Sequence, residues 1–198
     1  MIAFKGFTKD LKSVMGDGKK ETCQFTPGET KRVERSKTAN SGFHCCEYPP
    51  ACLGYYRYGE SRFFRVEASG DIDEDDAERI AATEITLVEE LDAKSFAKYT
   101  MLYMLNYPRR QAWKSHNKGV MVAKDKAEAK AAGHIAIARG ENPCVKGAEG
   151  SIVGLLVDSG GEILNAKMLV ITSKYAEKWL RINENREVEV IKDEGEGD

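Results

Sequence analysis

The sequence predicts an α+β fold, with a mixed N-terminal domain followed by a mostly-β C-terminal part that is rich in Gly and Ala. Two observations lead to this prediction. The first half mixes short strand-like runs with a single helical pattern, and the second half consists of apolar runs separated by glycines. The 198 residues leave room for one full domain or two small ones, and 41% hydrophobic residues suffice for a core.

Residues 1–70 are expected to form short strands and turns. Gly supplies a positive φ and Pro presets the first position of a turn, so clusters of the two mark the ends of strands. The expected elements are a strand from Ile2 interrupted at Gly6, turns at 16–18 and 27–29, a short helix beginning at Pro50, and a strand over Arg62–Ala68 that stops at Gly70.

The acidic block 71–79 carries six carboxylates, and we interpret it as the charged start of a helix. A calcium loop is disfavoured because the block lacks a Gly at the sixth position and a Glu at the twelfth. A strand is expected from Glu84 to Leu91. Apolar residues at helical spacing then predict a helix over 93–106, which the pair Tyr107-Pro108 ends.

Short strands of small residues are expected to dominate the second half of the chain. The runs at 119–123, 133–140 and 147–158 suit either the rungs of a short solenoid or a sandwich. Gly160-Gly161 is expected to turn a hairpin, and further strands follow over 162–172 and 187–191. The predicted organisation is an N-terminal domain over 1–106, a basic aromatic linker over 107–118, a mostly-β domain over 119–191 and an acidic tail over 192–198.

Charge is segmented along the chain although the total is only −2. Residues 1–70, 71–94, 95–149 and 150–198 carry net charges of +4, −8, +6 and −4. The total excludes a uniformly basic nucleic-acid coat and a polybasic membrane binder. The blocks favour either complementary packing between segments or separate surfaces of opposite sign.

The cysteines and the hydropathy of the chain indicate a soluble intracellular protein. The five cysteines are odd in number, two are adjacent and no signal-peptide pattern precedes them, so reduced and mostly buried thiols are expected. No run approaches the ~20 apolar residues of a membrane span, so no membrane partner is expected. Zinc binding is the alternative, but the spacing matches no zinc motif, and we expect no metal and no cofactor. The residues in question are Cys23, His44, Cys45, Cys46 and Cys52.

The stretch 107–118 interleaves basic and aromatic side chains. Arg109, Arg110 and Lys114 could hold a phosphate backbone while Trp113 stacks on a base. In the alternative interpretation, this stretch is a solvated loop that Trp113 pins to the core. His116 and His134 lack companions that would indicate a site.

Several segments together resemble an uncharacterised family common in bacteriophages and prophages. They are Ile2–Phe7, the run Gly-Phe-His-Cys-Cys-Glu-Tyr-Pro over 42–49, the pair Tyr55-Tyr56, and the strand ending in Val66–Gly70. Longer members of that family insert Gly-, Ala- and Ser-rich repeats that should build a solenoid. The resemblance implies a phage accessory protein in the cytoplasm of a bacterial host cell.

The segment from Gly42 to Tyr56 is also similar to part of the NAD site of ADP-ribosyltransferases. That resemblance would place Tyr55 or Tyr56 on the nicotinamide ring, and Lys5 with Gly6 where such enzymes keep a His-Gly or Arg-Gly pair. Lys5 lacks the planar fork of Arg, and no downstream Glu stands in an identifiable signature. His44 is interpreted as a structural imidazole rather than half of a Cys-His nucleophile.

Three functions are therefore considered. The favoured one is non-enzymatic binding of a host protein or protein–nucleic acid complex, for instance as an inhibitor of a bacterial defence system such as CRISPR-Cas. The alternatives are an NAD-using enzyme with an ADP-ribosyltransferase-like core, and a structural phage module. The oligomeric state is left open. The candidate binding residues are Lys5, His44, Tyr55, Tyr56, Arg109, Arg110, Trp113 and Lys114.

Overall fold

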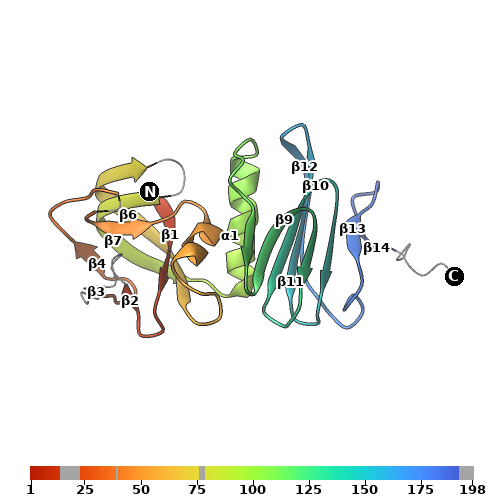
Figure 1. Cartoon of the computed structure of the whole chain (residues 1–198), viewed down its shortest axis with the longest axis horizontal. Coiled ribbons are helices and arrows are strands. Elements are labelled where there is room, and N and C mark those ends of the chain that lie inside the picture. Colours follow the sequence, from red (N-terminus) through yellow and green to blue (C-terminus); the bar gives the residue numbers. More distant parts are fainter. Residues whose placement is uncertain (14–22, 39, 76–78, 192–198) are drawn as a thin grey trace. The chain divides into compact units, whose positions relative to one another are not determined.

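A computed structural model of the chain describes residues 1–13, 23–38, 40–75 and 79–191, and it divides into two units, Met1–Asp92 and Ala93–Asp198 (Figure 1). Strands make up 53% of the structure and helix 11%. The fold is therefore mostly β, arranged in several sheets, and the α+β class expected from the sequence is wrong. The helix over 93–106 clusters with the second unit.

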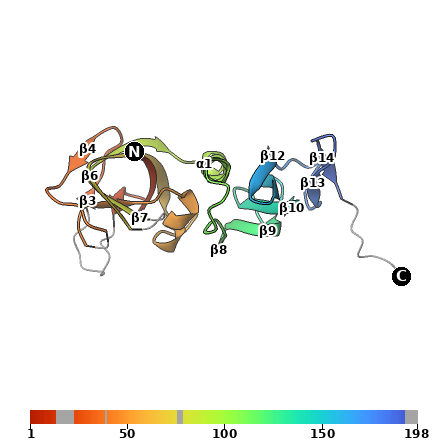
Figure 2. The same cartoon turned by 90° about the horizontal axis from the view of Figure 1, so that it is seen from above.

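The first unit is built from strands that follow one another around a common interior (Figure 2). Strand β6 pairs with β1 and β7, and β7 also pairs with β4 and β5, all antiparallel. An isolated bridge between Phe4 and Cys46 then connects β1 to the residue after β5. The elements are β1 (Ile2–Phe7), β2 (Lys12–Ser13), β3 (Cys23–Gln24), β4 (Thr30–Arg32), β5 (Phe43–Cys45), the 3-10 helix η1 (Pro49–Gly54), β6 (Arg62–Asp75) and β7 (Arg79–Glu90).

Aromatic rings fill the interior of the first unit. Phe7 meets Phe25 and Phe64 edge-on, with ring centroids 5.0 and 5.7 Å apart, and Phe25 meets Phe43 at 5.8 Å. Edge-to-face contacts at this distance add to the hydrophobic gain from burying the rings. The four rings come from β1, β5, β6 and the segment after β3, so one cluster connects elements far apart in the sequence.

The acidic block lies on strands rather than at the start of a helix, so the expected helix over 71–79 is wrong where the structure describes it. Strand β6 continues past Gly70 to Asp75, and Arg79 already belongs to β7. The cause is tertiary, because this end of β6 pairs with Ile80, Ala81 and Ala82, which are buried. Residues 76–78 lie outside the described part of the chain.

The second unit is a mixed sheet with one helix packed on it. Strands β9, β10 and β11 run parallel, β12 and β13 are added antiparallel, and β8 pairs with β9. The direction reverses after β11 through Gly160-Gly161, as expected, so parallel strands do not continue and no solenoid forms. The elements are α1 (Ala93–Asn106), β8 (Ser115–Asn117), β9 (Val120–Ala129), β10 (Ile135–Gly147), β11 (Ile152–Ser159), β12 (Glu162–Val170), β13 (Leu180–Ile182) and β14 (Val188–Val190).

Small residues allow β9 and β10 to fold into two close layers. Strand β9 bends at Asp125, which has φ 62°, and its end returns to its beginning, where the Glu128 amide donates to Met121 Sδ. The core between the layers is rich in alanine, including Ala123, Ala127 and Ala136. A positive-φ glycine stands shortly before each of the three parallel strands, at positions 119, 133 and 150.

Helix α1 covers the other face of this sheet at close range (Figure 1). A Cβ at Gly154 of β11 would lie only 2.6 Å from Met101 Sδ, so glycine is needed for this approach. The helix has the bounds that its spacing predicts. Among the residues that the structure describes, no helix is both long and apolar enough to cross a membrane.

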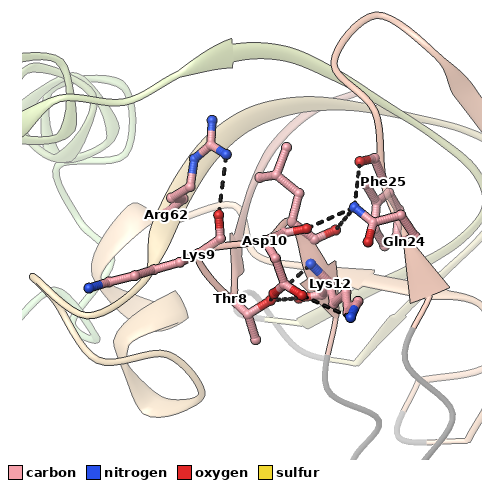
Figure 3. A network of polar contacts seen from close by, with 8 residues as sticks. Thr8, Lys9, Asp10, Lys12, Gln24, Phe25 and Arg62 are labelled. Carbon is pink, nitrogen blue, oxygen red and sulfur yellow. Dashed lines mark hydrogen bonds and ion pairs between the residues drawn. The ribbon is translucent and has the colours of Figure 1, made fainter.

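A tight polar network holds the turn between β1 and β2 (Figure 3). The Thr8 hydroxyl donates to Asp10 Oδ1 at 2.6 Å, and Lys12 Nζ lies 2.8 Å from Asp10 Oδ2. Gln24 Nε2 donates to the Asp10 carbonyl at 2.8 Å and so ties the turn to β3. The bonds from Lys12 and Thr8 lower the pKa of Asp10 to about 2. Leu11 lies within this hydrogen-bonded turn and has φ 58°, an unusual value for a non-glycine residue.

The Asp10 network predicts a specific acid dependence of stability. The pKa of Asp10 in the folded protein lies below its unfolded value of 3.8. The contribution of Asp10 to the free energy of unfolding is therefore present above pH 3.8 and is lost as the pH falls toward 2. We expect Asp10→Asn to show a smaller loss of stability between pH 5 and pH 2 than the wild type, measured by urea unfolding. Glu60→Gln, which removes the exposed partner of Arg57, is the matched control. Equal slopes for wild type and Asp10→Asn would contradict the prediction.

Candidate functional site

Lys5 lies inside the first unit. Side chains alternate along β1, and Ala3 and Phe7, which flank Lys5 on the same face, both belong to the core. The side chain of Lys5 follows them inward and is only 8% exposed. Its Nζ donates to the His44 carbonyl oxygen at 2.7 Å and so joins β1 to β5. The structure thus brings Lys5 and the backbone of His44 together.

Thiols surround this amine, and raised pKa values make two of them, Cys45 and Cys52, unreactive. Burial lowers the pKa of Lys5, and the nearby sulfurs of Cys45, Cys46 and Cys52 only partly offset that effect. Burial also raises the pKa of Cys45 to about 12, and a hydrogen bond with Cys46 is the largest cause of the raised pKa of Cys52. Protonated thiols are poor nucleophiles and poor metal ligands.

The other predicted residues of the first unit do not form one cleft with Lys5. The Tyr56 ring lies against Gly6, where a Cβ would be 2.5 Å from Tyr56 Cδ2. Because Gly6 and Lys5 point to opposite faces of β1, the tyrosine ring and the amine lie on opposite sides of the strand. Tyr55 is 64% exposed. Burial lowers the pKa of His44, and its Nε2 is buried with no hydrogen-bond partner among the described residues.

The suspected metal ligands do not converge. All five cysteines are free thiols, and Cys144 lies in the second unit. Within residues 1–13, 23–38, 40–75 and 79–191, no group of three or more His, Cys, Asp or Glu side chains is placed to hold a metal ion.

The basic aromatic stretch is anchored through a buried arginine that the sequence analysis did not single out. Arg139 of β10 is only 3% exposed, and its Nε donates to Asp158 Oδ2 at 2.6 Å. Its Nη2 donates to the Pro108 carbonyl, and its guanidinium lies 5.1 Å from the centre of the Trp113 ring. Trp113 is buried, so its indole holds the loop to the sheet and is not free to stack on a base.

Arg110 forms the second anchor of the same loop. Its guanidinium lies 4.1 Å from the centre of the Tyr107 ring, and its Nη1 donates to the Tyr103 hydroxyl at 2.8 Å. Arg109 and Lys114, in contrast, are exposed. The four predicted residues of this stretch therefore divide into two anchors, Arg110 and Trp113, and two side chains that face solvent.

A groove of about 380 Å³ in the second unit was missed by the sequence analysis. His116 and His134 both line it, together with Lys118 and Lys130. These residues come from β8, from the turn after it and from both ends of the connection between β9 and β10. The sequence signal is a pair of histidines, His116 and His134, with lysines between them, and it becomes meaningful once β8, β9 and β10 are paired.

The buried amine of Lys5 predicts a pH-dependent stability. The unfolded chain binds more protons than the folded chain between the lowered folded pKa and the ordinary value of 10.5, so stability rises with pH in that window. We expect Lys5→Met to increase the free energy of unfolding by about 1–3 kcal/mol at pH 7, because an apolar chain replaces a buried cation. The gain should shrink as the pH approaches 10, measured by urea unfolding of both proteins at each pH.

Ionisation of unfolded thiols above pH 9 affects the wild type and Lys5→Met alike. The difference in their free energies of unfolding therefore reports the effect of Lys5. Lys31→Met, at a partly exposed lysine of β4, is the control and should give a difference near zero at every pH. A Lys5→Met protein that is less stable than the wild type by the same amount at pH 7 and pH 10 would contradict the prediction.

The match to a known family covers the N-terminal half of the chain. Residues 1–99 match the family described as Domain of unknown function (DUF7666), which covers all of Met1–Asp92 and the first residues of α1. Neither the curated proteins nor the solved structures include a match to the chain. With half of its residues matched, the chain belongs to the DUF7666 family of domains of unknown function.

Proposed function

We propose that this chain is a phage-type accessory protein that binds an acidic surface of a host protein through Arg109 and Lys114. The anchored loop is the observation that carries the proposal. Arg139 and Trp113 hold one part of the loop, Arg110 holds another, and Arg109 and Lys114, which adjoin these anchors in the sequence, are exposed. A rigid loop loses little conformational freedom on binding, which favours its use as a contact.

A host protein fits this loop better than a nucleic acid does. Trp113 is buried and the face of Tyr107 is covered by Arg110, so stacking on bases has little support. Affinity for a phosphate backbone grows with the number of phosphates that Lys and Arg side chains neutralise. The part of the loop before β8 offers two exposed cations, Arg109 and Lys114, and the whole chain carries a net charge of −2. Two charges placed on a rigid loop suit the rim of a protein interface.

Binding is also better supported than catalysis. Cys45 and Cys52 have raised pKa values, and Lys5 is enclosed on the opposite side of β1 from the Tyr56 ring. An NAD site would need both groups to face one cleft that admits the ligand. The assignment to phages and to a target such as a defence complex rests on the sequence resemblance and belongs to the proposal.

The test is affinity capture from a bacterial host lysate, with the double variant Arg109→Glu/Lys114→Glu compared with the wild type. We expect the wild type to capture a protein at low salt that the variant loses, since reversed charges repel an acidic surface. The same protein should be released from the wild type at high salt. Mass spectrometry identifies the protein, and its purified form should bind the wild type at least tenfold more tightly than the variant.

Lys167→Glu/Lys174→Glu is the matched control, because both lysines are exposed in the same unit and lie outside the loop. Equal loss of capture in this control would show a general charge effect and contradict the proposal. Capture of no protein by the wild type would contradict it too, as would tight binding of a short DNA or RNA duplex that the loop variant abolishes.

A further inference from the structure

The groove in the second unit is formed where three strands meet. His116 of β8 is the partner of Met121 on β9, and Val120 of β9 is the partner of Ile135 at the start of β10. The Ile135 amide donates to the Gly119 carbonyl at 2.8 Å, which sets the turn after β8 beside the start of β10. The bend in β9 brings Glu128 to the same place, where its amide donates to Met121 Sδ at 3.5 Å.

Charge in the groove is mainly positive. Lys118 and Lys130 contribute two ammonium groups, and His116 and His134 add two imidazoles that donate hydrogen bonds. Glu128 is the one acidic side chain among the groove's described lining residues, and Lys146 Nζ lies 2.9 Å from its Oε1. The carboxylate is therefore already paired with a cation outside the lining, and the two lysine charges remain available for an anion.

The floor of the groove is apolar. Val120 and Ile135 are buried, and Met121 is partly buried against the core between the two layers of the sheet. A groove of about 380 Å³ is within the range of small-molecule sites. A ligand that matches it carries an anionic group for the rim and an apolar group for the floor.

The number of charges favours a phosphate monoester over a carboxylate. The groove offers two ammonium groups, which match the nearly two negative charges that a phosphate monoester carries near pH 7, whereas a carboxylate carries one. We infer that this groove binds a small phosphate monoester with an apolar substituent. The inference is independent of the proposed function, because neither Arg109 nor Lys114 lines the groove.

Phenyl phosphate is the probe, because it joins a doubly charged phosphate to an apolar ring. Calorimetry and backbone-amide NMR of the full chain should show saturable binding with shifts at residues 116–121 and 130–135. We expect Lys118→Gln/Lys130→Gln to weaken the affinity about tenfold or more, since both charge-assisted contacts are lost. The control Lys167→Gln/Lys174→Gln, at exposed lysines outside the groove, should stay within about twofold of the wild type.

Two further ligands separate the contribution of the apolar floor from that of the lysines. Inorganic phosphate should bind more weakly than phenyl phosphate, and phenol should bind more weakly still. Equal affinity for inorganic phosphate would overturn the role of the apolar floor, and equal affinity for phenol would overturn the role of the lysines. No shift at these residues with ~10 mM phenyl phosphate, or an equal loss in the control variant, would overturn the site itself.

Discussion

The buried guanidinium of Arg139 is the interaction on which the second unit depends. A charged group that is 97% removed from solvent must be compensated, and here Asp158 on β11 supplies the opposite charge. The same carboxylate accepts from the Gly161 amide through its other oxygen, which fixes the turn between β11 and β12. Because the guanidinium also contacts Pro108 and Trp113, a single buried side chain orders two strands, a hairpin and the basic loop.

The first unit handles its buried cation differently. Lys5 has a carbonyl, thiols and an aromatic ring near its amine, but its burial outweighs these contacts and makes it easier to deprotonate. Arginine does not have this option, because its pKa is too high. The two units therefore show two solutions to the same problem: Arg139 is paired with a carboxylate, and the pKa of Lys5 is lowered.

Local sequence patterns predicted many elements of the fold. The helix over 93–106, the strand beginning at Arg62 and the hairpin at Gly160-Gly161 are confirmed, because each depends on periodicity or turn chemistry within a short window. The acidic block was misinterpreted because its strand pairing is made by residues of β7 further along the chain. The α+β class was wrong for the same reason, since the first unit gains strands where helix was expected.

The candidate sites also depend in part on local sequence and in part on contacts between distant segments. By itself the sequence determined the residue types available, the segmentation of charge and the basic aromatic stretch, because these are properties of composition and order. Only the tertiary structure decided which of those side chains face solvent. It buried Trp113 against Arg139, separated the Tyr56 ring from Lys5 by one strand, and gathered His116 and His134 around one groove. The physical reason is that burial and pairing depend on contacts between distant segments, which no local pattern records.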